Sequence, residues 1–261
     1  MLRIGVTGTD TGVGKTVVSV ALLAMLREEG LRVAAMKPVE TGVERGVPDS
    51  DTARLRAAAG SEDPETLVCP IVLPEPLAPW IAARRAGVTI DPSELDAPFE
   101  ALSRGRDAVL VEGAGGLLVP LTGEVAFDTL FRRWDAEVIL VAADRLGVLN
   151  HTRLTVAVAE AAGLTVRGVV LNSGPDPHAG AVSPGDPQEP ARETNLDVLR
   201  ELIPHVPIVH FPRLEDPWDA SRAAEVAREC GLRALLPSQE AVEGGPPKGE
   251  GGRHRAPPRD T

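Results

Sequence analysis

The sequence predicts an α/β fold with a single doubly wound, mostly parallel sheet and helices on both of its faces. Short runs rich in Val, Ile and Leu alternate along the chain with amphipathic segments of helical period. The runs are apolar at consecutive positions, as is typical of strands that are buried on both faces. Gly30, Gly163 and Gly231 follow three of the amphipathic segments, where a helix often ends in a left-handed residue.

The expected elements alternate in chain order. Strands are expected over residues 2–7, 33–38, 108–112, 138–142, 167–172 and 208–211. Helices are expected over residues 15–29, 51–59, 77–85, 93–104, 151–162, 195–203 and 219–230. Asn150 stands where the N-cap of the helix over 151–162 is expected. Ligands of such sheets bind at the carboxyl ends of the strands, so polar residues at those ends are the candidate site.

The length and composition indicate one domain. The chain has 261 residues, 43% of them hydrophobic, which is enough for a large core. We expect this domain over residues 1–236 and a disordered tail over residues 237–261, where Gly, Pro and charged residues dominate. Residues 174–190 are expected to form a surface loop because Pro, Gly, Asp and Ser are frequent there.

The charge and the cysteines restrict partners and location. The formal net charge of −11 argues against a broad nucleic-acid-binding face, and no apolar run reaches the ~20 residues of a membrane span. The 2 cysteines, Cys69 and Cys230, lie far apart without Cys or His neighbours, so neither a zinc site nor a disulfide framework is expected. No leader pattern precedes the first strand. We therefore expect a cytoplasmic protein without nucleic-acid or membrane partners.

The first strand runs into the loop T-G-T-D-T-G-V-G-K-T, which closes on Lys15 and Thr16. A Gly-rich loop between a strand and a helix directs backbone N–H groups at phosphate oxygens, and the helix N-terminus adds partial positive charge. Lys15 is expected to reach the outer phosphates, and the Thr16 hydroxyl to ligate magnesium. A Gly-rich turn without function is the alternative, but a complete strand, loop and helix favour nucleotide binding.

The loop departs from the common pattern at two positions. Thr9 occupies the usual first glycine position, and Gly8 comes one residue earlier. Asp10 stands where the P-loop ATPases of cell division and chromosome partitioning carry a signature lysine. That class is therefore a competing interpretation rather than the first one.

Lys37 and Asn172 each end an expected strand. An ammonium at the exit of a buried strand can stabilise a transferred phosphoryl group, although a lysine that extends into solvent is the simpler interpretation. The amide of Asn172 offers a donor and an acceptor, as an adenine edge requires, but asparagine is also a common turn residue. The phosphate-binding loop upstream favours the functional interpretation of Lys37, whereas neither interpretation of Asn172 is favoured over the other.

Asp51 and Glu112 are candidate magnesium ligands. Asp51 opens an expected helix after Asp49 and Ser50, either of which can cap the helix and leave Asp51 for a metal. Glu112 ends the strand over 108–112 and is followed by small residues, at the place where a carboxylate supports the magnesium held by Thr16. A charged strand end followed by a turn is the alternative for Glu112.

Taken together, these motifs resemble the dethiobiotin synthetase family, the ATP-dependent ring-closing enzymes of biotin synthesis. The resemblance runs from the first strand to about residue 236. It is carried by the loop over 6–16, Lys37-Pro38-Val39, Ser50-Asp51, the E-G-A-G-G strand end over 112–116, Leu146-Gly147 and Asn150-His151. It implies a P-loop NTPase-like fold. It also implies a reaction in which 7,8-diaminopelargonate and CO2 form a carbamate, ATP phosphorylates the carbamate, and the second amine closes the ureido ring.

The resemblance further implies roles for single residues, with ATP and Mg²⁺ as cofactors. The implied catalytic groups are Lys37, Lys15 and Thr11, and the implied metal ligands are Thr16, Asp51 and Glu112. The diamine substrate is expected at Thr41, Thr11, Asn150 and His151, the last two from the second subunit of a homodimer. The implied nucleotide contacts are Gly12, Val13, Gly14, Lys15, Thr16, Asp51, Glu112, Gly113, Ala114, Gly115, Asn172, Ser173, Phe211, Pro212 and Arg213.

Three other classes compete with this interpretation. A partitioning or positioning ATPase acts through partners, and Asp10 together with the acidic charge counts against it. A cobyrinate-type amidating synthetase needs an attached glutaminase domain with a nucleophilic cysteine, for which the chain is too short. A P-loop protein that binds nucleotide without turnover is less favoured because Lys15, Thr16 and Glu112 are all present.

Overall fold

The computed structural model describes residues 1–174 and 189–237, and in this part of the chain it contains a six-stranded parallel sheet. The sheet order is β2-β5-β1-β6-β7-β8. Its strands are β1 (Leu2–Gly8), β2 (Val33–Met36), β5 (Ala108–Gly116), β6 (Glu137–Ala143), β7 (Val166–Asn172) and β8 (Ile208–Phe211). A second, two-stranded parallel sheet pairs β3 (Val39–Thr41) with β4 (Ile71–Leu73).

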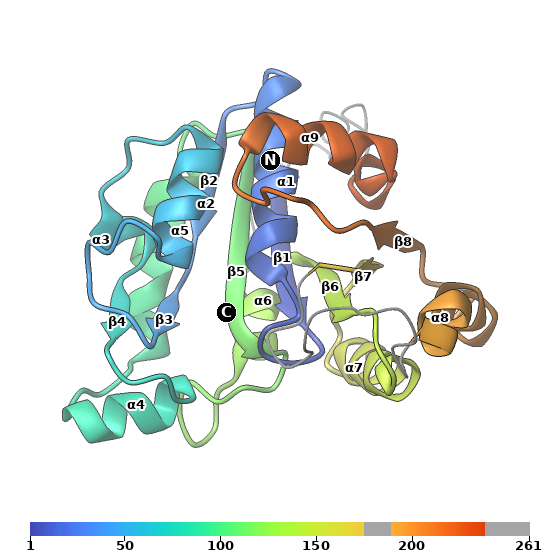
Figure 1. Ribbon diagram of the computed structural model, residues 1–261. Helices are drawn as coiled ribbons and strands as arrows, with labels where there is room; N and C mark the ends of the chain where they lie inside the picture. The colour runs from blue at the N-terminus through green and yellow to red at the C-terminus, as the bar shows by residue number, and fades with distance from the viewer. Residues whose placement is uncertain (175–188, 238–261) are drawn as a thin grey trace, which may run out of the picture.

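Helices follow most of these strands (Figure 1). They are α1 (Lys15–Glu28), α2 (Asp51–Ala59), α3 (Glu65–Val68), α4 (Pro79–Ala86), α5 (Asp96–Ser103), α6 (Phe127–Arg133), α7 (Val148–Ala161), α8 (Glu189–Leu202) and α9 (Ala220–Glu229). Two 3₁₀ turns, η1 (Pro92–Leu95) and η2 (Leu232–Leu235), complete the described elements. No helix in the described part of the chain is long and apolar enough to span a bilayer.

Alternate residues of the central strands face two different layers of helices. Ile4 and Val6 of β1 join a core with α1, α2 and α9, whereas Val109 and Val111 of β5 face the opposite side. On that opposite side, β6 and β7 pack on α7 and α8. Both faces of the sheet are therefore covered, which confirms the expected fold and explains why the strand sequences do not alternate.

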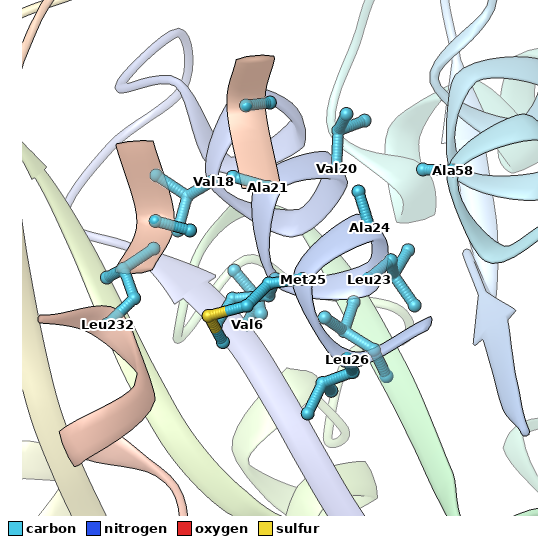
Figure 2. Close-up of a cluster of buried hydrophobic side chains, with 14 of the residues drawn as sticks. Val6, Val18, Val20, Ala21, Leu23, Ala24, Met25, Leu26, Ala58 and Leu232 are labelled. Atoms are coloured by element: carbon cyan, nitrogen blue, oxygen red, sulfur yellow. The ribbon is translucent and has the colours of Figure 1, made fainter. Parts of the chain in front are cut away.

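Helix α1 is buried at every position from Val18 to Leu26. Figure 2 shows its side chains gathered with Val6 of β1 and Leu232 of η2. A helix that is apolar all round is enclosed by its neighbours, and α1 lies between the sheet, α2 and α9. This enclosure fixes the loop that precedes α1 against the carboxyl edge of the sheet.

The expected strands and helices agree with the structure apart from their ends and several short elements. β3, β4, α3 and α6 were not expected, because segments of 3 to 7 residues carry little periodicity. The helix expected over 93–104 divides into η1 and α5, because the Asp91 side chain accepts a hydrogen bond from Ser93 N and starts a separate 3₁₀ turn. Gly30, Gly163 and Gly231 are left-handed at the helix ends, as predicted.

The expected surface loop and the expected tail consist mostly of residues outside the described ranges. Of the surface loop expected over 174–190, residues 175–188 lie outside the described residues, and α8 begins at Glu189, earlier than the expected 195. Of the tail expected over 237–261, all but Pro237 lies outside them.

Candidate functional site

The loop over residues 9–14 connects β1 to α1 and strongly favours glycine at two positions. Gly12 and Gly14 have φ values of 75° and 90°, in the region that other residues rarely adopt. A Cβ at Gly14 would lie 2.0 Å from Asn172 Nδ2. Gly14 is the N-cap of α1 and offers no side chain, so the first backbone N–H groups of the helix remain for a ligand. This is the geometry of an anion-binding loop.

The Lys15 side chain folds back over the loop and is almost buried. It is 7% exposed, and its Nζ donates to the backbone oxygen of Asp10 at 3.3 Å. Burial, aided by the charge of Lys37, lowers the pKa of Lys15 to about 8, although Glu112 and Asp51 act in the opposite direction. No carboxylate among residues 1–174 and 189–237 pairs directly with Lys15, so an anionic phosphate would stabilise its charged form.

Lys37 lies between two carboxylates from other elements. Its Nζ is 2.6 Å from Glu112 Oε1 and 2.9 Å from Asp51 Oδ2. The side chain of Lys37 is 4% exposed, that of Glu112 0% and that of Asp51 34%. Burial alone lowers the pKa of Lys37, but Glu112 and Asp51 outweigh it and raise the pKa above its ordinary value. Lys37 is thus held as an ammonium at the carboxyl edge of the sheet, not as a lysine reaching into solvent.

Thr16 and the two carboxylates form one polar cluster. Thr16 Oγ1 donates to Glu112 Oε1 at 3.0 Å, although the two residues are 96 positions apart. Burial opposes ionisation of Asp51, but Lys37 and Thr16 outweigh it and keep the pKa of Asp51 below its ordinary value. Ser50, rather than Asp49, caps α2 by accepting from Ala53 N, so the Asp51 side chain stays available. The cluster therefore brings two carboxyl groups and a hydroxyl around the Lys37 ammonium.

These donors fit magnesium. Glu112 Oε2 is buried and has no hydrogen-bond partner among the described residues. Within residues 1–174 and 189–237, no group of three or more His, Cys, Asp and Glu is arranged to enclose a metal. Magnesium suits such a partial site, because it is usually held by one or two carboxylates, several waters and the substrate phosphates. Thr16, Asp51 and Glu112 as its ligands remain a prediction.

The strand end after Glu112 lies against the loop. Gly8 pairs with Gly116, and a Cβ at Gly115 would lie 3.2 Å from Thr11 Oγ1. Gly115 has a φ of 66°, so the chain turns there in a conformation that favours glycine. The stretch from Gly113 through Ala114 is thereby placed beside the anion-binding loop, and its contacts with nucleotide remain predicted.

Asn172 supports the loop from the other side. Its Nδ2 donates to Val13 O at 2.9 Å, and its Oδ1 accepts from Gly174 N at 3.1 Å. The residue is 4% exposed. One amide hydrogen and one oxygen lone pair remain after these two bonds, so adenine recognition by Asn172 stays a prediction while its structural role is evident.

The remaining predicted nucleotide residues lie near the ends of β7 and β8. Ser173 N donates to Phe211 O, and Ser173 Oγ lies 2.8 Å from His210 Nε2. The Phe211 ring is fully buried in the core around α1, so this residue can offer a nucleotide only its backbone. Pro212 and Arg213 follow directly after β8.

The predicted substrate residues are less concentrated. A groove of about 410 Å³ lies between the loop, residues 116–120 and α7, and Thr11 lines it. Asn150 and His151 are exposed near the start of α7 and do not line this groove. Thr41 is partly exposed at the end of β3. The structure thus brings only Thr11 of this set into the groove.

The predicted N-cap role of Asn150 is wrong. Helix α7 begins at Val148, and its N-cap is Gly147, with a φ of 94°. Asn150 lies inside the first turn. The helix starts after Gly147, three residues before the position predicted from Asn150. The left-handed backbone of this glycine, rather than a side-chain cap, marks the start of the helix.

Two buried carboxylates near the site were not predicted. Glu40 on β3 accepts from Asp51 N and Thr52 N. Asp144, just after β6, accepts from Asn195 Nδ2 at 2.8 Å and from Ser173 Oγ at 3.3 Å. Asp144 directly follows a predicted strand, which is a signal that could have found it, whereas Glu40 lies on an element too short to be expected.

Comparison with known proteins identifies the family. A family model described as an AAA domain matches residues 3–215. The ATP-dependent dethiobiotin synthetase BioD of Anaeromyxobacter sp. (strain Fw109-5) is 43% identical over 197 residues, which are 76% of this chain and 87% of the relative. The same enzyme of Bacillus cereus (strain G9842) is 34% identical over 246 residues, 92% of this chain and 97% of the relative.

Solved structures support the fold alone. The Aquifex aeolicus MinC:MinD cell division protein complex matches with a TM-score of 0.51 at 13% identity, covering 97% of this chain and 100% of that chain. Apo McdA of Cyanthece matches with a TM-score of 0.51 at 12% identity, over 90% of this chain and 100% of that chain. The likeness to these two structures is one of architecture. The sequence relatives agree with the motifs, and the chain belongs to the dethiobiotin synthetase family.

Proposed function

We propose that this chain is an ATP-dependent dethiobiotin synthetase, a ligase that forms dethiobiotin from 7,8-diaminopelargonate and CO2. One observation carries the proposal: the anion-binding loop, the Lys37 ammonium and the two carboxylates meet in one cluster, in a chain 43% identical to an enzyme of that name. The reaction needs these groups together, because a carbamate and a triphosphate, both anionic, must approach one another.

The nucleotide is proposed to lie along the loop. Backbone N–H groups from Gly12 to Thr16 would bind the phosphates, and Lys15 would neutralise their charge. Thr16, Asp51 and Glu112 would hold Mg²⁺, which offsets the charge on the triphosphate. The base is proposed to lie at the ends of β7 and β8, at Asn172, Ser173 and the segment 211–213.

Lys37 is proposed to act on the reacting atoms. Its ammonium is fixed by Glu112 and Asp51 rather than free to rotate. A fixed cation can stabilise negative charge on the carbamate oxygen and on the phosphoryl group as it transfers, without having to reorganise during the step. The second amine of the substrate then attacks the activated carbonyl carbon and expels phosphate. Thr11 and Thr41 are proposed to hydrogen-bond the amines or the carbamate.

We propose a homodimer whose interface covers the groove beside the loop. Leu118, which lines it, is 56% exposed, Leu154 on the same groove is 57% exposed, and Leu146 before α7 is 74% exposed. Exposed apolar side chains that lie together beside a groove are typical of an interaction site. A second copy placed there would cover these leucines and bring the start of its α7, with Asn150 and His151, toward the carboxylate of the diamine.

The location and the other partners follow from chemistry. Cys69 and Cys230 are free thiols, and ATP is a substrate found where thiols stay reduced, so we propose a cytoplasmic enzyme. The net charge of −11 supports small-molecule substrates rather than nucleic acid as partners. No membrane partner is proposed.

The test is product formation with purified protein. Phosphate release should require diaminopelargonate and bicarbonate together, and the product mass should match dethiobiotin. Lys37→Ala should lower turnover far more than ATP affinity. Arg32→Ala is the control and should behave as wild type, since Arg32 is exposed and pairs with Asp107, the residue just before β5. ATP hydrolysis that ignores the diamine, with no dethiobiotin formed, would reject the proposed reaction.

A further inference from the structure

Glu40 is a buried carboxylate directed at the first turn of α2. It is 6% exposed, and its Oε1 accepts from Asp51 N at 2.7 Å. Its Oε2 accepts from Thr52 N at 3.1 Å and from the Thr52 hydroxyl. Both oxygens are therefore engaged by the two residues that open the helix.

This contact is not needed to cap α2. Ser50 is already the N-cap, and its hydroxyl accepts from Ala53 N at 3.1 Å. Glu40 instead takes the N–H groups of Asp51 and Thr52, which are free donors at the start of any helix. A carboxylate here also lies at the positive end of the helix. Two side chains therefore hold the start of α2: Ser50, the N-cap of the helix, and Glu40 on β3.

Glu40 holds the backbone of the residue whose side chain pairs with Lys37. Glu40 is three residues after Lys37 on the same stretch of chain, and Asp51 Oδ2 accepts from Lys37 Nζ at 2.9 Å. The chain therefore contacts Asp51 at two points, its backbone N–H through Glu40 and its side chain through Lys37. Without Glu40, Asp51 would lose its backbone hydrogen bond and would be held to this stretch of chain only by the ion pair with Lys37.

We propose that Glu40 is a positioning residue, which holds Asp51 so that its carboxylate faces the Mg²⁺-nucleotide pocket beside Glu112. The inference rests on the proposed function, in which Asp51 contributes to the metal site. Partners of this kind fix the orientation of a ligating side chain, and their loss lowers metal affinity by about 10- to 100-fold.

The test compares two substitutions that act on the same helix. Glu40→Ala removes the contact to Asp51 N, whereas Ser50→Ala removes a cap hydrogen bond and leaves Asp51 held. ADP binding is measured by calorimetry across a Mg²⁺ titration and again with the metal chelated. Glu40→Ala should raise the Mg²⁺ concentration for half-maximal enhancement of ADP binding about 10-fold or more. ADP affinity without metal should change less than about twofold, and Ser50→Ala should leave the Mg²⁺ requirement as in wild type.

A conservative variant and a direct variant complete the test. Glu40→Gln keeps one acceptor oxygen, so its Mg²⁺ requirement should fall between wild type and Glu40→Ala, and it decides the matter if Glu40→Ala does not fold. Asp51→Asn should weaken the Mg²⁺ response on its own. If Asp51→Asn weakens it while both Glu40 variants match Ser50→Ala, the positioning role is overturned. If Asp51→Asn leaves the Mg²⁺ response unchanged, the metal assignment in the proposed function fails instead.

Discussion

Replacing Lys37 with methionine should destabilise the protein strongly, because it leaves two carboxylates without their shared cation. Methionine is one heavy atom shorter than lysine but keeps its unbranched, flexible shape, so the change in packing is small. The Asp51 side chain is 34% exposed and can recover water, whereas that of Glu112 is 0% exposed and cannot. Leaving one partner of a buried ion pair unpaired costs about 3–5 kcal/mol, and most of that cost should come from Glu112.

The assay is thermal unfolding in the presence of EDTA. For a protein of this size, about 3–5 kcal/mol corresponds to a fall in Tm of roughly 6–20 °C. The double variant Lys37→Met with Glu112→Gln should recover part of the loss, because the unpaired charge is then absent. Arg32→Met, at the exposed pair with Asp107, should change Tm little. A Tm of Lys37→Met equal to that of wild type would refute the buried-pair reasoning.

Four further outcomes are expected. Lys15 has a pKa of about 8 in the ligand-free protein, and phosphate favours its charged form, so ADP affinity should fall as pH rises above about 8. Calorimetry near pH 8.5 in buffers of different ionisation enthalpy should show that ADP binding takes up protons. Equal ADP affinity from pH 7 to 9.5 would contradict this. Gly14→Ala places a Cβ 2.0 Å from Asn172 Nδ2 at a φ of 90°. ADP binding should therefore be lost while circular dichroism still reports a folded chain. Normal ADP binding by this variant would contradict the loop geometry. Asn172→Ala leaves Val13 O without its donor and should lower the unfolding free energy by about 1–3 kcal/mol in urea titrations; an unchanged midpoint would show that the bond contributes nothing. Chelation of divalent metal should stop dethiobiotin formation and added Mg²⁺ should restore it, and full turnover in EDTA would remove the metal from the mechanism.

Much of the fold was predictable because its signals are local. The strand, the glycine loop and α1 follow one another within the first 28 residues, and each has a distinct pattern. Lys37 and Glu112 were predictable as neighbours for a different reason. Lys37 directly follows β2, and Glu112 lies within β5. The two strands pair in parallel with Met36 beside Val111, which places the two next residues side by side.

Other features depend on packing that a single sequence does not contain. Glu40 becomes a contact of Asp51 only because the intervening chain returns α2 to the end of β3. The contact of the Asn172 amide with Val13 depends on the approach of β7 to the loop, and adenine recognition by the same amide stays a prediction. The start of α7 depends on a left-handed glycine, Gly147, that a search for side-chain caps passes over.

The most direct test of the account is a crystal structure with a non-hydrolysable ATP analogue and Mg²⁺. We expect the triphosphate along residues 8–16, with the metal beside the Thr16 hydroxyl and the carboxylates of Asp51 and Glu112, and with Lys37 facing the terminal phosphate. A nucleotide bound elsewhere on the molecule, with that loop empty, would contradict the single shared pocket on which the proposed function depends.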